Sequence, residues 1–177
     1  ADLHLGYSIG CDDMRKMAER INALNPDVVI YAGDIFDNDY DALDDEAELK
    51  EILHSINAKY GSYAVFGNHD VTETLVGGFS TASSRKAFRD SRMESFLDEA
   101  GINIMLDEVT TIADGKINLI GRLDGEKAGD GTRNRKDLSE LIEQCDMSKP
   151  VIVINHEPDK LHEAADMGVD VMLSGHT

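Results

Sequence analysis

This chain of 177 residues carries acidic, imidazole and amide side chains at two kinds of position. Some stand at its very start, and others directly follow apolar, strand-like runs. Six of them are candidate metal ligands, namely Asp2, His4, Asp34, Asn68, His156 and His176. Ligands of open α/β sheets bind at the edge formed by the carboxyl ends of the strands. Asp, His and Asn without thiolates suit divalent first-row metals such as Mn, Fe, Zn, Ni or Co. The set is larger than one ion needs, whereas two ions that share a bridging carboxylate would use it well.

The residues between these candidates predict an α/β fold that positions them. Short β-branched or apolar runs predict strands at 27–32, 62–66, 109–113, 117–120, 151–154 and 169–173. Apolar residues at helical spacing predict helices around 11–24, 49–56, 93–100, 138–142 and 161–167. Asp114-Gly115 predicts a two-residue hairpin turn. Residues 71–84 are rich in glycine, serine and threonine, and residues 122–136 are charged and rich in glycine. We expect both segments to be surface loops that shape a pocket.

Composition indicates one globular domain over residues 1–177 with a real hydrophobic core. The 35 acidic and 17 basic side chains give a formal net charge of −18. Phosphate surfaces repel such a chain, so we expect no strong binding to nucleic acid. No stretch approaches the roughly 20 apolar residues of a membrane span. Cys11 and Cys145 fit no metal or disulfide spacing and are expected to be reduced thiols.

Both ends of the sequence fall inside expected working segments. No apolar strand precedes Asp2, and the chain stops at Thr177 directly after a strand-like run. We therefore expect the first strand and a C-terminal part of the fold to lie outside the sequence given. Membrane association through a segment ahead of Ala1 stays open, and so does the choice between a cytoplasmic and a membrane-associated location.

Five motifs in order along the whole chain resemble those of the calcineurin-like metallophosphoesterases. They are DLH, GDIFD, GNHD, NHEP and GHT. The family pattern is D-x-H, G-D-x-x-D, G-N-H-D/E, a lone H and G-H-x-H. The HEP and SGHT segments look like those of a bacterial phosphodiesterase branch that is often tethered to membranes. The resemblance implies a four-layer α/β/β/α sandwich of the metallophosphoesterase type, truncated at both ends.

The resemblance also implies roles for single residues. The implied metal ligands are Asp2 and His4 for the first ion, Asp34 for both ions, and Asn68, His156 and His176 for the second. The family has another first-site ligand two positions after His176, which falls beyond Thr177, so the first site lacks that ligand here. His69 would stay off the metals and act on the substrate.

The implied reaction is hydrolysis of phosphate esters. A hydroxide bridging two divalent metals would attack phosphorus, and His69 would assist the leaving group. The resemblance to the phosphodiesterase branch favours phosphodiester or pyrophosphate bonds as substrates. The alternatives are a phosphomonoesterase and a non-catalytic metal-binding scaffold of the same fold. Every family position within the sequence holds an apt residue, which favours an enzyme.

Other polar residues have a structural interpretation beside the functional one. Asp37 either orients a metal ligand or caps the following turn. Asp70 receives no catalytic role, and the acidic run 37–51 is expected to be a solvated helix face. His54 and His162 are expected to be solvated on helices. Four arginines near the loops could clamp a phosphate, namely Arg85, Arg89, Arg133 and Arg135.

Overall fold

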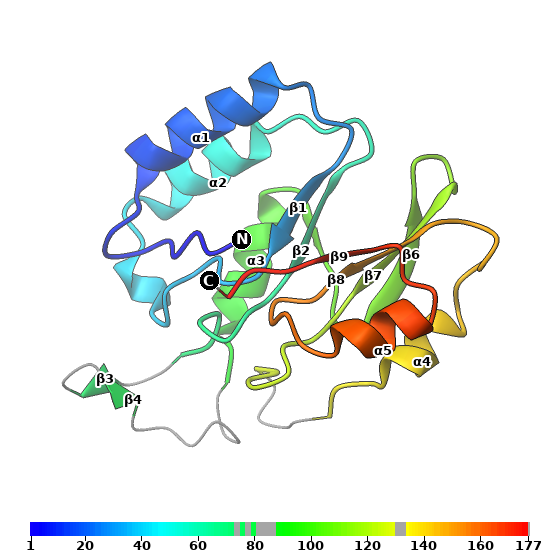
Figure 1. Ribbon diagram of the computed structural model, residues 1–177. Helices are drawn as coiled ribbons and strands as arrows, with labels where there is room; N and C mark the ends of the chain where they lie inside the picture. Colours follow the sequence, from blue (N-terminus) through cyan, green and yellow to red (C-terminus); the bar gives the residue numbers. More distant parts are fainter. Residues whose placement is uncertain (73–74, 77–78, 81–87, 130–133, 177) are drawn as a thin grey trace.

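The computed structural model describes residues 1–72, 75–76, 79–80, 88–129 and 134–176. Its first sheet has three parallel strands in the order β1 (Val29–Ala32), β2 (Ser62–Val65) and β5 (Ile102–Ile104). Three helices cover one face of this sheet (Figure 1), namely α1 (Cys11–Ala23), α2 (Glu46–His54) and α3 (Ser91–Glu99). A short 3-10 turn, η1 (Tyr40–Ala42), precedes α2. None of the described helices is both long enough and apolar enough to cross a bilayer.

The second sheet has the order β6 (Glu108–Ile112), β7 (Ile117–Gly121), β8 (Val151–Ile154) and β9 (Val171–Leu173). β6 and β7 form an antiparallel hairpin, and the other neighbours are parallel. Two short helices pack on its outer face, α4 (Leu138–Ile142) and α5 (Leu161–Asp166). The remaining pair, β3 (Leu75–Val76) and β4 (Phe79–Ser80), lies within a segment predicted to be a loop.

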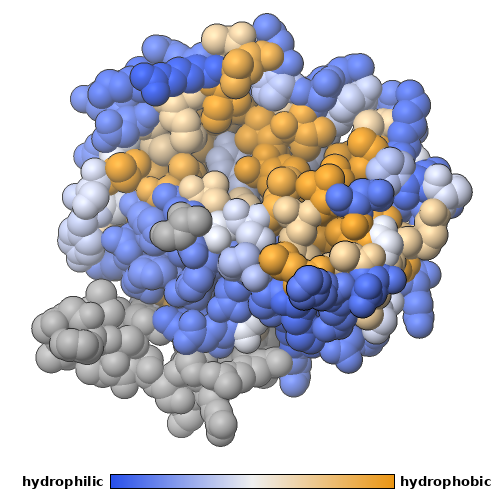
Figure 2. Space-filling model, in the orientation of Figure 1, coloured by the Kyte–Doolittle hydropathy of each residue, from blue (hydrophilic) through white to orange (hydrophobic). Residues whose placement is uncertain are grey.

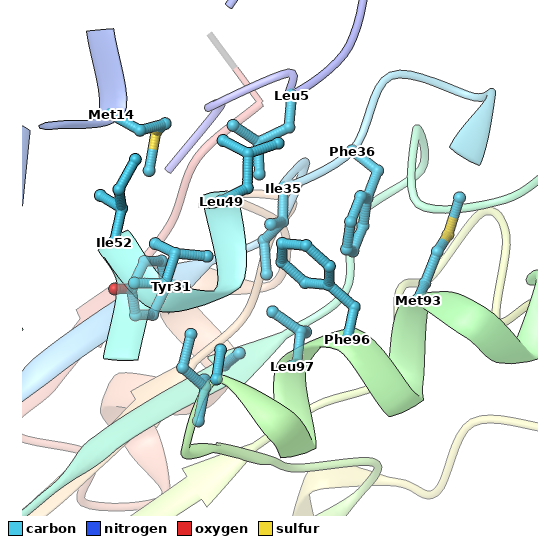
Figure 3. Close-up of a cluster of buried hydrophobic side chains, with 14 of the residues drawn as sticks. Leu5, Met14, Tyr31, Ile35, Phe36, Leu49, Ile52, Met93, Phe96 and Leu97 are labelled. Carbon is cyan, nitrogen blue, oxygen red and sulfur yellow. The ribbon is translucent and has the colours of Figure 1, made fainter. Parts of the chain in front are cut away.

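Alternating side chains divide the core into layers. Val29 and Tyr31 of β1 pack with the first three helices, whereas Ile30 and Ala32 face the second sheet. Figure 3 shows Tyr31 among the buried side chains of this first cluster. On β8, Ile154 faces the first sheet, and Val151 and Val153 pack against α4 and α5. Successive residues of a strand point to opposite faces, so each strand contributes to two interfaces. The fold is therefore α/β with two sheets and helices, and these interfaces are consistent with the expected α/β/β/α sandwich.

The acidic run 37–51 is a solvated helix face only from Glu46 onward, so the prediction holds for α2 and is wrong for residues 37–45. The Asp39 carboxylate accepts from the backbone N–H of Asp41 and caps η1, while Asp45 accepts from the N–H of Glu48 and caps α2. Asp44 accepts from the backbone N–H of Cys11 at the start of α1. Aspartate competes for free backbone N–H groups and so favours helix starts over helix interiors. These carboxylates therefore divide the run into a turn and a shorter helix.

The predicted elements differ from the structure in two further places. The pairing of Ile112 with Ile117 leaves four residues in the hairpin loop, not two. Within that loop, the Asp114 carboxylate accepts a hydrogen bond from the hydroxyl of Tyr60, a contact between the two sheets that a local pattern cannot predict. β5 was not predicted, because a three-residue strand has too few residues to show an alternating pattern.

Apolar side chains gather in the middle of the face shown in Figure 2, where β1 and β9 lie in Figure 1. Among the described residues, β1 and β9 each lie at an edge of their sheet. β9 is only partly buried, with 44% of Val171 exposed, whereas all residues of β1 except Ile30 are buried. Edge strands of both sheets thus lie on one face, and two of the candidate ligands, Asp34 and His176, follow the carboxyl ends of these strands.

Tyr31 offers a test of the packing between β1 and the helices. Its hydroxyl is buried and has no hydrogen-bond partner among the described residues. Burial raises the pKa of Tyr31 to about 12. Unfolded tyrosine ionises near pH 10, so between about pH 10 and 12 the unfolded chain loses this proton first and the free energy of unfolding falls as pH rises.

We expect Tyr31→Phe to change the free energy of unfolding by less than about 1 kcal/mol at pH 8, because no hydrogen bond is lost. At pH 11 the variant should be more stable than the parent by a further ~1 kcal/mol. Urea unfolding at both pH values measures the two differences. A loss above about 2 kcal/mol at pH 8 would show that the hydroxyl has a partner.

Candidate metal centre

The structure brings the six predicted ligands to the carboxyl ends of both sheets. Four of them follow strand ends, namely Asp34 after β1, Asn68 after β2, His156 after β8 and His176 after β9. Asp2 and His4 lie on the N-terminal segment, which runs beside the chain after β1. The backbone N–H groups of Asp2 and His4 donate to the carbonyls of Gly33 and Asp34, each over 3.0 Å.

One group of ligand atoms matches the predicted second ion. The Nε2 atom of His156 lies 3.1 Å from Oδ1 of Asn68 and 3.1 Å from Oδ2 of Asp34. The Nδ1 atom of His176 lies 2.9 Å from the same Asn68 oxygen. Carboxylate, amide and imidazole atoms from four separate segments thus converge on one point.

A second group matches the predicted first ion. Ligand atoms of Asp2, His4 and Asp34 lie within 4.8 Å of one another. Asp34 belongs to both groups, as a bridging ligand must. A cavity of about 240 Å³ opens over them and is lined by Asp2, His4, Asp34, His69 and His176.

The electrostatics of the buried pair Asp34 and His156 favour a cation between them. Burial alone would raise the pKa of Asp34, but hydrogen bonds from the His156 ring and the His69 backbone outweigh it and hold the pKa below its usual value. Burial lowers the pKa of His156, yet the Asp34 carboxylate and the Ala32 carbonyl raise it to about 9 overall. The Asp34 carboxylate thus stabilises positive charge at this position, and a divalent ion would supply such a charge.

The donor set fits a divalent metal. Nδ1 of His156 lies 2.9 Å from the Ala32 carbonyl, which fixes that nitrogen as a donor and leaves Nε2 for the metal. The Asn68 oxygen can only accept, yet it faces two imidazole nitrogens. Lone pairs that converge in this way repel unless a proton or cation lies between them. Imidazole with carboxylate and amide oxygen is a ligand mixture for divalent first-row metals.

The backbone of the site is strained at the ligands themselves. Four of the six predicted ligands take positive φ angles, namely Asp2 at 58°, His4 at 49°, Asp34 at 50° and His176 at 62°. Residues other than glycine rarely adopt this conformation, and such strain concentrates at functional sites. The fold holds these side chains in place against a local conformational cost.

Two glycines make room for the ligands. A Cβ atom on Gly33 would lie 2.4 Å from Nδ1 of His156, and one on Gly67 would lie 2.4 Å from Oδ1 of Asp34. Real Cβ contacts are not this short, so any larger residue would displace a ligand. The glycines in the GD and GNH motifs are therefore required by close packing around the site.

His69 lines the cavity without joining the second-ion group. Its backbone N–H donates to Oδ1 of Asp34 over 2.8 Å, and its ring packs edge-on against the His4 ring at 4.8 Å between centroids. With His4 and Asp37, its ring forms a third group of candidate ligand atoms. The ring is 39% exposed, which leaves it accessible from the cavity.

The sequence left Asp37 and Asp70 without a settled role, and the structure places both. The turn η1 is capped by Asp39 and not by Asp37. Oδ1 of Asp37 instead lies 3.5 Å from Nδ1 of His4 and 3.4 Å from Nδ1 of His69. Asp70 is fully buried, which raises its pKa to about 7. It accepts backbone hydrogen bonds from three residues of the motif loops, namely Ile35, Phe36 and Gly67. Asp70 therefore braces the loops that carry Asp34 and Asn68.

Asn38 is a site residue that sequence reasoning missed. It directly follows the GDIFD motif, and its side-chain amide nitrogen lies 2.7 Å from Nδ1 of His69. No spacing rule marks an asparagine at this position, because the contact joins the chain after β1 to the chain after β2. Its left-handed backbone, with φ at 58°, is a local feature that asparagine tolerates well.

Two of the four arginines expected to clamp a phosphate, Arg89 and Arg135, lie in the described part of the chain, and both bind other protein groups instead. The Arg89 guanidinium lies 3.8 Å from the Phe66 ring centre and bonds to Glu94 and the Ala128 carbonyl. Arg135 bonds to Asn155 and lies 3.6 Å from an Asp159 carboxylate oxygen. Arg85 and Arg133 lie outside the described residues. His54 and His162 are exposed, as expected.

The whole chain, residues 1–177, matches the model of the calcineurin-like phosphoesterases, so this protein belongs to that family. It is 26% identical to UDP-2,3-diacylglucosamine pyrophosphatase LpxG of Chlamydia trachomatis. It is 28% identical to a transmembrane protein with metallophosphoesterase domain of Danio rerio, and 28% identical to the uncharacterized metallophosphoesterase YkuE of Bacillus subtilis. Each match covers 100% of this chain. It covers 61% of the Chlamydia trachomatis protein, 38% of the Danio rerio protein and 56% of the Bacillus subtilis protein. The chain thus spans about half the length of these relatives.

We expect Gly67→Ala to destabilise the protein by about 1–3 kcal/mol and to lower bound Mn²⁺, because the added methyl group would displace Asp34 or His156. Urea unfolding and metal analysis after dialysis measure the two effects. Gly115→Asn is the matched control, since space is open there and asparagine accepts the left-handed backbone. Unchanged metal content in Gly67→Ala would contradict the tight packing described above.

Proposed function

We propose that this protein hydrolyses phosphodiester or pyrophosphate bonds with two divalent metal ions. The first ion would be held by Asp2, His4 and Asp34, and the second by Asp34, Asn68, His156 and His176. The observation that carries the proposal is the position of Asp34, whose carboxylate belongs to both groups of converging ligand atoms. We propose that residues 1–177 act as one catalytic domain of a phosphoric ester hydrolase.

When bound by these residues, divalent ions would lower the pKa of a bound water and would neutralise phosphoryl oxygens. The protein's own part is to hold the ligands and the substrate in place. His69 lines the same cavity and lies outside both ligand groups in this assignment, so its ring can donate a proton to the leaving oxygen of the substrate. The strained ligand backbone and the buried Asp70 keep these groups preorganised.

The relatives support the choice of bond. One relative is named a UDP-2,3-diacylglucosamine pyrophosphatase, whose name describes cleavage between two phosphoryl groups. A net charge of −18 disfavours a nuclease that grips long polymers. Another relative is named a transmembrane protein. We therefore propose to test a membrane-associated substrate alongside small soluble diesters.

A non-catalytic metal-binding scaffold is the alternative. His69 is the feature that favours an enzyme, because a scaffold needs no exposed imidazole beside the metal ligands. The test is an assay of the full-length protein with bis-p-nitrophenyl phosphate, mono-p-nitrophenyl phosphate and a nucleoside diphosphate ester. Mn, Fe, Zn, Ni and Co are supplied in turn. Diester or pyrophosphate turnover above monoester turnover is the expected result, and no turnover with any metal would contradict the proposal.

Replacing His69 with alanine separates catalysis from metal binding. We expect His69→Ala to keep two Mn²⁺ per chain while kcat for a diester falls on the order of a hundredfold or more, because only the proton donor is removed. His156→Ala is the matched comparison and should lose metal, since His156 is a ligand in this account. Metal analysis and steady-state kinetics measure both. If His69→Ala loses a metal ion, His69 is a ligand and the assignment of roles is wrong.

A further inference from the structure

Tyr7 is an aromatic side chain that the fold leaves in water near the metal centre. Its exposed fraction is 76%. Residues 6–8 form a turn, and Leu5 and Ile9 pair in a bridge at the base of this turn. The backbone around Tyr7 is therefore held in a defined conformation, although the ring itself has little protein packed on it.

The turn is attached to the chain that follows β1. Leu5 forms a second bridge with Phe36, and the backbone N–H of Asp37 donates to the carbonyl of Leu5 over 3.2 Å. His4 directly precedes this contact and lies three residues before Tyr7. Three residues span at most about 11 Å, so the Cα atom of Tyr7 lies within that distance of the Cα atom of His4.

The hydroxyl end of Tyr7 is fixed as well. It donates to Oδ2 of Asp39 over 2.8 Å, while Oδ1 of the same carboxylate caps η1. This hydrogen bond is the main reason that the pKa of Tyr7 is raised, and the Asp37 carboxylate adds a smaller part. The hydroxyl thus stays protonated at neutral pH. Because both ends of the side chain are held, the ring loses little freedom when a ligand packs on it.

The anchor of the hydroxyl lies beside residues that contact His69. Asp39 directly follows Asn38, whose side chain touches the His69 ring, and Oδ1 of Asp37 lies 3.4 Å from Nδ1 of that ring. In the proposed reaction, His69 faces the leaving group of the substrate. Tyr7 therefore flanks the side of the cavity toward which a leaving group extends.

A tyrosine ring held in this way has its two faces to offer a ligand. Its hydroxyl is already bonded to Asp39, so the remaining interaction is stacking on an apolar face. Nucleobases and aryl groups stack on tyrosine, and the contact tolerates different bases because every base has a π face. In a nucleotide one sugar joins the base to the phosphate, which suits the short span from His4 to Tyr7.

We propose that Tyr7 is a specificity-determining residue that stacks on a planar ring, such as a nucleobase, attached to the phosphoryl group of the substrate. The inference rests on the proposed function, because the metal centre must hold the phosphoryl group. No bond forms or breaks in this contact. Tyr7 therefore acts on binding, and its loss should raise KM and leave kcat nearly unchanged.

Binding of product-like ligands tests the stacking without turnover. A nucleoside 5′-monophosphate and ribose 5-phosphate, which lacks the base, are titrated by calorimetry into the full-length protein loaded with Zn²⁺. The parent should bind the nucleotide about tenfold more tightly than ribose 5-phosphate. Tyr7→Ala should remove this difference, and Tyr7→Phe should retain it because the ring remains. Equal affinities in the parent, or an undiminished difference in Tyr7→Ala, would overturn the proposal.

Tyr60→Ala is the matched control. Tyr60 also donates its hydroxyl to an aspartate, since it bonds to Oδ2 of Asp114 over 3.3 Å. It directly precedes the start of the first sheet's strand β2, whereas Asn68 follows the carboxyl end of that strand. The control should keep the affinities of the parent for both ligands. Bound Zn²⁺, measured in every variant, shows whether the ligand His4 is still in place.

Kinetics in Mn²⁺ separate a failure of this inference from a failure of the proposed function. For a nucleoside diphosphate ester, Tyr7→Ala should raise KM about tenfold, and for the analogue without a base KM should not change. A parent that hydrolyses these esters while Tyr7→Ala keeps its KM values would contradict the stacking alone. A parent that binds neither phosphate and hydrolyses no ester would contradict the proposed function, and the role of Tyr7 with it.

Discussion

The carboxylate of Asp34 is buried between the two ligand groups and belongs to both. A buried carboxylate is costly unless charge or hydrogen bonds compensate it. Here Oδ1 accepts from the backbone of His69, while Oδ2 faces the imidazole of His156. This one group therefore joins the chain ends after β1, β2 and β8. The close approach of Gly33 and Gly67 and the strained ligand backbone are consequences of packing four segments around one carboxylate.

The scaffold is built to bring these segments together. The layer of apolar side chains between the two sheets joins β1 and β2 to β7 and β8 and so sets the distance between their carboxyl ends. Asp70 then ties the two loops of the first sheet through three backbone N–H groups. Rigid sheets with short loops fix ligands better than long loops could. The packing of the two sheets therefore explains how residues as distant in sequence as Asp2 and His176 come to lie together, with the N–H of His176 donating to the Asp2 carboxylate.

The sequence predicts the part of this arrangement that local rules describe. The strand-end positions of Asp34, Asn68 and His156 follow from apolar runs, and the ordered motifs predict the family, which the comparison confirms. The contacts of Asn38 and Asp70 could not be predicted, because each joins two loops and no periodicity encodes such a contact. The four-residue hairpin loop was missed for the same reason, since the contact of Asp114 with Tyr60 is tertiary. The strand β5 was missed because three residues are too few to show an alternating pattern.

The central claim is that side chains from distant segments form one site for two ions that share Asp34. Crystals of the protein soaked in Mn²⁺ and measured at the manganese absorption edge test this most directly. The account predicts two anomalous peaks about 3.5–4 Å apart. One peak would touch Asp2 and His4, the other would touch Asn68, His156 and His176, and both would contact Asp34. A map with no peak at Asp34, or with ligand side chains turned away from one another, would contradict it.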